Sequence, residues 1–538
     1  MQAKSLPPTS SLTILSSSQS AKELDASPTT AYSAGHLPSY RAVKNLPYEL
    51  REHCMIYLEE GLHCQALNLL TSLLTSGSTS SSPLPAFLPP PHYLALIATL
   101  AVHPTLTTRA KTLDRVQAAN LALRYLRLVL KHAGPVNGNL NDAFTFNSLS
   151  FSSRRGGSGR RRTTGEGAIP PVDDDERIDT ELANAGSLWA HAEGFWHVVG
   201  WCFNCSILHK RRWERWNAWL TYMIEVLEVD WDAREHGEGH ESREKSLIMK
   251  YINSGATTAG RQRHIIRAVF ADGRTKSVAE FGEIWKNETK ELKKDVDVTK
   301  AEKKIDIEAD NYGDYMEDED DEDLADSPED LSPPPEQMSE SIPNVADDLG
   351  GMDSVNLRLR LLSLLSKVSA GLPDDFTDLN TLYDNFLEHI RSLPIPAFFL
   401  IISPTTLRVF TPAAASSLAQ YILRSLIAAS APLPLNDNIS QDILGRSYLP
   451  FPANTTSIVD NTKVSLCVET LLRLLDHHIG LAWTPGLHEA AEAGIKARTA
   501  KAKKKQTKRG TDRDWGGDGT WLAASAERIR GVVGMAKP

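Results

Sequence analysis

Apolar side chains recur at helical spacing along most of the chain, because residues three and four apart lie on one face of an α-helix. The clearest stripes are Leu50, Cys54 and Leu58; Ala66, Leu67, Leu70, Leu73 and Leu74; Ala118, Leu121, Ala122, Tyr125, Leu128 and Val129; and Val468, Leu471, Leu472, Leu475 and Ile479. The pattern predicts an all-α protein, built as helical hairpins, a bundle or an irregular helical-repeat array with long disordered charged linkers.

Tryptophan is concentrated in the middle of the sequence, where seven of the eleven lie between Trp189 and Trp231. Trp189, Trp196 and Phe203 are spaced by seven residues, and a second stripe follows the charged break at residues 209–212. That second stripe consists of Trp213, Trp216, Leu220, Met223 and Leu227. Since indole rings bury large areas, we predict a helical hairpin with a dry seam, and an open polar cavity in its place would contradict a scaffold.

Segments rich in Ser, Pro, Gly or charge divide the helical pattern into parts. The predicted parts are 1–43, a disordered Ser/Thr/Pro tail; 44–132, an N-terminal helical region; 133–185, a disordered basic and acidic linker; 186–293, a Trp-rich helical region; 294–352, an acidic disordered insert; 353–490, a C-terminal helical region; and 491–538, a basic tail.

Residues 57–67 contain a Gly followed closely by a small Ala, namely Gly61 and Ala66. In this respect the stretch resembles the turn of a tetratricopeptide-type hairpin, in which a Gly closes the first helix and an Ala lets the second pack tightly. The resemblance covers about 30 residues, roughly 47–75, and one copy of the motif. It implies the packing of one helix pair there.

Charge is distributed unevenly along the 538 residues, whose net charge is −10. Residues 306–348 hold 18 carboxylates and no basic side chain, and without them the net charge becomes +8. The run at 317–323 favours a solvated spacer, with binding to basic partners or to the chain's own basic tail as alternatives. Ser327 and Ser332 each precede a proline and are candidate phosphorylation sites.

Two basic clusters, at 154–162 and 496–509, are typical of nuclear import signals or nucleic-acid contacts. The candidate residues are Arg160, Arg161, Arg162, Lys501, Lys503, Lys504, Lys505, Lys508 and Arg509. No aromatic residue interrupts 496–509, so base stacking is not indicated there. An import signal is the preferred interpretation, which places the protein in the nucleus, with the cytoplasm as the alternative.

The five cysteines are too scattered for a disulfide framework and favour a reducing compartment. Cys202 and Cys205 form a CxxC, and His209 follows four residues later on the same projected helical stripe. These three are the candidate metal ligands, but a structural zinc site needs a fourth, so buried core cysteines are the preferred interpretation. No cofactor is assigned.

Two further groups of titratable side chains, a histidine pair and a set of carboxylates, are expected to have structural roles. Adjacent His477 and His478 point about 100° apart on a helix and cannot share one ion. Four carboxylates near Trp231 are expected to solvate the Trp-rich helix, namely Glu225, Glu228, Asp230 and Asp232. No apolar stretch reaches the roughly 20 residues that a membrane span requires.

These patterns contain no glycine loop for phosphates and no catalytic motif. The predicted function is therefore a non-catalytic nuclear scaffold or adaptor of eukaryotic type that binds protein partners through helical surfaces. The alternatives are a chromatin- or RNA-associated factor that uses the basic segments, and a metal-dependent enzyme centred on Cys202, Cys205 and His209.

Overall fold

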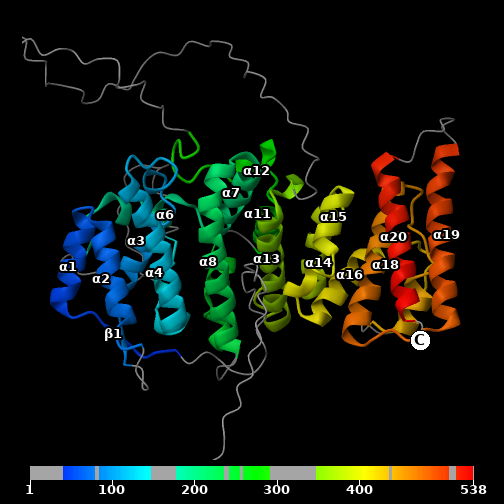
Figure 1. The fold of residues 1–538 in the computed structure, drawn as a ribbon, viewed down its shortest axis with the longest axis horizontal. Helices are drawn as coiled ribbons and strands as arrows, with labels where there is room; N and C mark the ends of the chain where they lie inside the picture. The colour runs from blue at the N-terminus through cyan, green and yellow to red at the C-terminus, as the bar shows by residue number, and fades with distance from the viewer. Residues whose placement is uncertain are drawn as a thin grey trace, which may run out of the picture. The chain divides into compact units, whose positions relative to one another are not determined.

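The computed structural model describes residues 40–78, 84–146, 177–235, 241–254, 258–290, 347–434, 439–507 and 516–536 (Figure 1). Helices dominate these ranges, which confirms the predicted all-α class. The longer helices are α1 (Tyr48–Glu59), α2 (His63–Thr75), α3 (Pro91–Leu100), α4 (Leu113–Asn137), α7 (Phe195–Leu208), α8 (Lys210–Glu235), α10 (Leu247–Asn253), α11 (Thr258–Val269), α13 (Met352–Gly371), α14 (Leu379–Ile390), α15 (Ile395–Ile402), α16 (Pro412–Leu426), α18 (Ile458–His478), α19 (Pro485–Thr507) and α20 (Gly516–Met535).

Short helices connect them: α5 (Leu140–Ala143), α6 (Leu188–His191), α9 (Glu241–Glu244), α12 (Thr275–Glu280) and α17 (Gln441–Ile443). The described residues also contain single turns of other helix types: Pro104–Leu106, Glu181–Ala183, Asp347–Leu349, Leu407–Val409 and the π-helical Leu444–Tyr448. Within the described ranges, none of the helices combines the length and the apolar character needed to cross a membrane.

The N-terminal region begins with the hairpin of α1 and α2, which turns at Gly61 with a φ of +71°. A glycine suits that position because side chains with a Cβ rarely adopt positive φ. The Ser- and Pro-rich stretch 76–91, inside the predicted helical region 44–132, contains strand β2 (Ala86–Leu88), which pairs in parallel with β1 (Val43–Asn45). Periodicity could not predict this pair, since each strand has only three residues.

Helix α4 is interrupted at Gly134, whose φ is +73°, and helical geometry then resumes at Pro135. A Cβ at Gly134 would overlap the ring of Tyr40, so the break also has a packing reason. The N-terminal helical region therefore extends past the predicted limit at residue 132, through α5 to the buried Phe144.

The Trp-rich region forms the predicted hairpin of α7 and α8, and its apolar stripes are buried. Trp196, Trp213 and Trp216 are each at most 6% exposed, which confirms the dry seam. One part of the prediction is wrong: Trp189 lies on α6 and not on the helix of Trp196, because Ala192 is extended and breaks the repeat. Trp189 stacks on Phe144 and donates to the Ala95 carbonyl of α3 at 2.8 Å.

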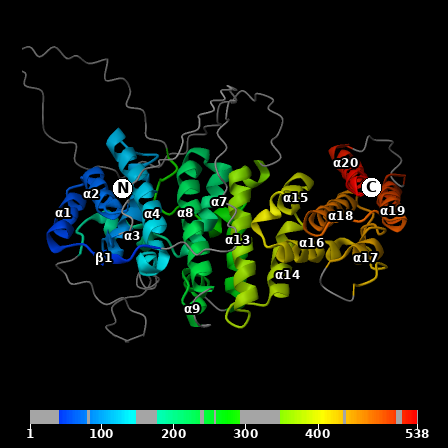
Figure 2. The same cartoon turned by 60° about the horizontal axis from the view of Figure 1, so that its bottom comes forward.

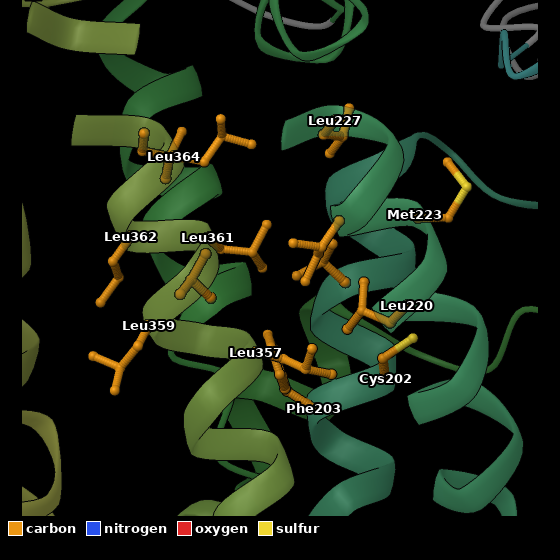
Figure 3. Close-up of a cluster of buried hydrophobic side chains, with 14 of the residues drawn as sticks. Cys202, Phe203, Leu220, Met223, Leu227, Leu357, Leu359, Leu361, Leu362 and Leu364 are labelled. Atoms are coloured by element: carbon orange, nitrogen blue, oxygen red, sulfur yellow. The ribbon is translucent and has the colours of Figure 1, made fainter. Parts of the chain in front are cut away.

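Helix α13 is buried on more than one side and joins the Trp-rich and C-terminal regions (Figure 3). Leu357 and Leu361 point toward α7 and α8, where Phe203 and Leu220 lie, whereas Leu359 points away from them. Helix α14 and the turn Leu407–Val409 also contact α13. A helix that is apolar on several sides must pack against a neighbour on each side. The stability of α13 therefore depends on contacts with both the Trp-rich and the C-terminal region.

In the C-terminal region, α18 is the central helix and contacts α15, α16, α19 and α20 (Figure 2). The helical region does not end at residue 490 as predicted, because α19 and α20 both pack on α18. Leu522, Ile529 and Val533 bury one stripe of α20. Ser525 and Arg528 of the same helix bind the Glu469 carboxylate of α18 at 3.0 and 2.7 Å.

Candidate functional site

A cavity of about 240 Å³ opens where α7 gives way to α8. Its lining residues are Thr108, Leu208, His209, Lys210, Arg211, Arg212, Glu288, Thr289 and Lys290. Four of these are cationic side chains and one is a carboxylate. This concentration of positive charge makes the start of α8 the candidate functional site.

The local backbone creates this cavity. Helix α7 ends at Leu208, and His209 has φ −134° and ψ 70°, so the chain leaves the helical conformation for one residue. The His209 carbonyl then accepts from the Trp213 amide at 2.8 Å and starts α8. The first turn of α8 carries Lys210, Arg211 and Arg212, although the positive end of a helix dipole favours acidic side chains there.

Arg212 turns inward and forms a buried ion pair with Glu288 at 2.6 Å. Its guanidinium also donates to the Thr107 hydroxyl at 3.0 Å and lies over the ring of Trp216 at 4.9 Å. The second carboxylate oxygen of Glu288 accepts from the Ile284 amide at 2.9 Å. Burial raises the pKa of Glu288, and the adjacent Arg212 opposes that rise. The pair connects the N-terminal region, α8 and the segment after α12.

The other cations of the cavity lie nearer to solvent. Lys210, Arg211 and Lys290 are exposed, and Arg211 has an interaction partner. Glu283 is an exposed carboxylate close to His209, where burial of the imidazole lowers its pKa and Glu283 opposes that shift. Because Arg212 neutralises Glu288, the cavity and its opening keep an excess of positive charge.

The predicted CxxC does not line this cavity. Cys202 and Cys205 are both fully buried, and desolvation raises the pKa of each thiol well above its ordinary value. A thiol that stays protonated is a poor nucleophile and a poor metal ligand. Both residues therefore serve as core side chains of α7.

His209 is not brought together with the two cysteines, because the helix on which that alignment depended ends one residue earlier. Its ring lies beside Trp201 with centroids 5.9 Å apart. Among the described residues, no group of three His, Cys, Asp or Glu side chains could hold a metal ion. The metal-dependent enzyme centred on Cys202, Cys205 and His209 thus has no support in the geometry.

Asn204, which lies between the two cysteines, has a polar role that the hydrophobic pattern did not predict. Asn204 is fully buried; its amide donates to the Ser277 and Phe281 carbonyls at 3.2 and 3.0 Å, and its oxygen accepts from the Gly273 amide at 2.9 Å. A lone Asn inside an apolar helix was the available signal, because a buried amide needs such partners.

The carboxylates near Trp231 do more than solvate α8. Glu228 binds Arg360 of α13 through both oxygens, at 3.0 and 2.6 Å. Asp230 is buried and accepts from the Leu247 amide at the start of α10 and from Arg234, at 2.8 and 2.9 Å. Asp232 also pairs with Lys367 of α13, at 3.4 Å. These three carboxylates attach α8 to its neighbours, so the expectation of simple solvation was wrong for them.

The basic candidates of the C-terminal segment separate into two groups. Lys501 donates to the Ala453 carbonyl at 2.6 Å, whereas Lys503 is exposed near the end of α19. The other basic candidates lie outside the described side chains: Arg160, Arg161, Arg162, Lys504, Lys505, Lys508 and Arg509. The candidate phosphorylation sites Ser327 and Ser332 also lie outside the described residues.

His477 and His478 are exposed at the end of α18, with their ring centroids 5.0 Å apart. They belong to no metal-binding group in the part of the chain that the structure describes. This agrees with a histidine pair at a helix end.

Comparison of the sequence with models of known protein families and with curated proteins found no match to either.

Proposed function

We propose that this protein is a non-catalytic scaffold or adaptor that binds protein partners through helical surfaces. The observation that carries the proposal is the use of buried positive charge. Apart from Arg212, the deeply buried cations in the described regions donate to backbone carbonyls of neighbouring segments and do not line the basic cavity at α8.

Arg358 of α13 illustrates this arrangement. Its guanidinium is fully buried, donates to the Val269 and Ala271 carbonyls at 2.6 and 2.8 Å, and lies 4.0 Å from the centre of the Phe203 ring. Burial lowers its pKa to about 9, so the group stays charged at neutral pH. The last carbonyls of α11 have no partner within their own helix, and Arg358 supplies one.

Three other cations act in the same way in different parts of the chain. Lys463 of α18 donates to the Arg391 and Leu393 carbonyls, both at 2.7 Å, just after α14. Arg41 donates to the carbonyls of Leu74, Ser76 and Leu84, and Arg498 to those of Leu449 and Phe451. Successive helices are therefore fixed by charge-assisted hydrogen bonds.

Fixed helices suit a binding protein, since a surface that is already ordered loses less entropy when a partner binds. A catalytic role would need titratable groups that converge on a substrate cavity. The buried cysteines and cations described above are instead used within the fold.

We propose the nucleus as the site of action, on the basis of the two basic clusters. Lys501 and Arg498 are engaged with backbone carbonyls, so an import signal or a nucleic-acid contact would depend on the other basic residues of 496–509 and on 154–162. The alternative of a chromatin- or RNA-associated factor uses these same residues and is an outcome of the test below.

The test is purification of the tagged full chain from its native cell, with and without nuclease. We expect the same protein partners in constant proportion in both samples, and fewer of them with Arg358→Ala, because loss of that side chain loosens α11 from α13. The matched control is Arg408→Ala, an exposed arginine, which should bind like the wild type. Partners that disappear with nuclease would favour the nucleic-acid alternative, and a stoichiometric metal in the purified protein would contradict the scaffold.

A further inference from the structure

The basic cavity at the start of α8 is lined by more cationic side chains than the one carboxylate among its described lining residues, Glu288, can neutralise. Arg212 is used by Glu288, but Lys210 and Lys290 remain exposed at the cavity with Arg211 beside them. These lysines and the positive end of the α8 dipole have the same sign, so their proximity is unfavourable unless an anion lies between them.

A second feature of the cavity is independent of the helix end. The Thr108 hydroxyl lines the cavity and is buried, with no hydrogen-bond partner among the described residues. A hydroxyl can donate to a carboxylate, and buried polar atoms in native proteins are generally paired. The cavity thus offers positive charge to an anionic group, and its wall holds a buried hydroxyl that has no partner among the described residues.

The most acidic part of this chain is covalently attached beside the same cavity. Lys290 lines the cavity, and the 56 residues that follow it, 291–346, lie outside the described ranges. The chain returns at the turn Asp347–Leu349, which contacts α7, and Gly350 packs directly on Ser206. Ser206 is two residues before Leu208, another lining residue, so both attachment points lie at the same end of α7.

From these observations we propose that the cavity at the start of α8 binds the chain's own acidic run, residues 317–323. The run consists of seven consecutive carboxylates and begins 27 residues after Lys290. A random coil of 27 residues has a root-mean-square end-to-end distance of about 30 Å, so the number of intervening residues is sufficient for the run to reach the cavity at a high effective concentration. Carboxylates at the cavity interact with Lys210 and Lys290, the two exposed lysines that line it.

The proposal has a consequence for partners. An acidic segment of another protein would have to displace the intramolecular one before it could use this cavity. This inference does not depend on the scaffold proposal, because its test involves the full chain and a synthetic peptide alone.

The test uses a fluorescent peptide of residues 312–326 and two forms of the full chain. In one form, every Glu and Asp of 317–323 is replaced by Gln or Asn, so the internal competitor is removed. We expect the peptide to bind this neutralised protein at least tenfold more tightly than the wild type, and the affinity to fall as salt is added.

The cavity is tested by charge reversal in the neutralised protein. Lys210→Glu with Lys290→Glu should abolish peptide binding, whereas the matched pair Lys44→Glu with Lys276→Glu reverses two exposed lysines elsewhere and should leave it unchanged. Equal affinity for wild-type and neutralised protein, no binding to either, or equal loss with both reversals would overturn the proposal. An RNA or phosphopeptide that bound wild-type and neutralised protein equally at this cavity would also overturn it, because the occupant would then come from another molecule.

Discussion

Arg212 and Arg358 are both buried guanidinium groups over aromatic rings, on the neighbouring helices α8 and α13, but their surroundings differ. Arg358 donates to two carbonyls in closely packed structure, 2.6 and 2.8 Å away. Arg212 pairs with Glu288 and lines a cavity that carries three further cations. The fold itself uses the charge of Arg358, whereas the cavity beside Arg212 holds additional positive charge that can bind a ligand.

The largest expected effect is that of Glu288→Ala, which leaves the Arg212 charge buried without its partner. We expect the free energy of unfolding to fall by about 3–5 kcal/mol, as measured by denaturant titration. The double variant Glu288→Met with Arg212→Met removes both charges and should recover much of that loss. If the double variant were as unstable as Glu288→Ala, the unpaired charge would not be the cause.

Arg358→Met tests whether the guanidinium of Arg358 stabilises the contact between α11 and α13. It leaves the buried Val269 and Ala271 carbonyls without their hydrogen-bond donor. We expect the free energy of unfolding to fall by about 2–4 kcal/mol. Hydrogen exchange should show faster opening of α11 and α13, with α18 unaffected. Unchanged exchange in α11 would mean that the guanidinium does not stabilise this junction.

Acid should lower the free energy of unfolding through His103, which lies close to Arg212. His103 packs on Trp285 with centroids 4.8 Å apart, and burial together with Arg212 lowers its pKa to about 4. The unfolded chain has an ordinary histidine pKa of about 6.5, so it binds more protons than the folded protein between these values. This contribution to stability is therefore complete above about pH 6.5 and declines as the pH falls, by about 2 kcal/mol at pH 5 and about 3 kcal/mol at pH 4. His103→Gln should reduce this dependence in thermal melts at pH 7 and pH 5, and the remainder is expected from other partly buried histidines such as His197 and His389, whose pKa values burial also lowers. An unchanged slope would assign the whole dependence to those other groups.

The smallest expected effect is that of Lys210→Glu. The substitution places a carboxylate in the first turn of α8, where the helix dipole favours it by about 0.3–1 kcal/mol. We expect a small gain in stability by denaturant titration together with weaker anion binding. A marked loss of stability would show that Lys210 belongs to the structural cations, like Arg358.

Local signals in the sequence predicted the turn at Gly61 and the buried seam of α7 and α8. Each of these depends on residues that are close in sequence. The stripe of α20 was also present, at Leu522, Ile529 and Val533, but glycines around it and the basic segment before it favoured a tail.

The cavity could not be predicted, because its ion pair joins residues 76 positions apart and its hydroxyl comes from the N-terminal region. The charged break at residues 209–212 was visible, but which of its cations turned inward was not. An isolated cation in an apolar stretch, such as Arg358 or Lys463, is the sequence signal that could have identified the structural charges.

Zero-length cross-linking of carboxylates to lysines in the wild-type full chain, read by mass spectrometry of the monomer, tests most directly whether the surplus charge at α8 has an occupant. The account predicts links from residues 317–323 to Lys210 or Lys290, lost at high salt. Links confined to other lysines, such as Lys44 and Lys276, or found only between two copies of the chain, would contradict it.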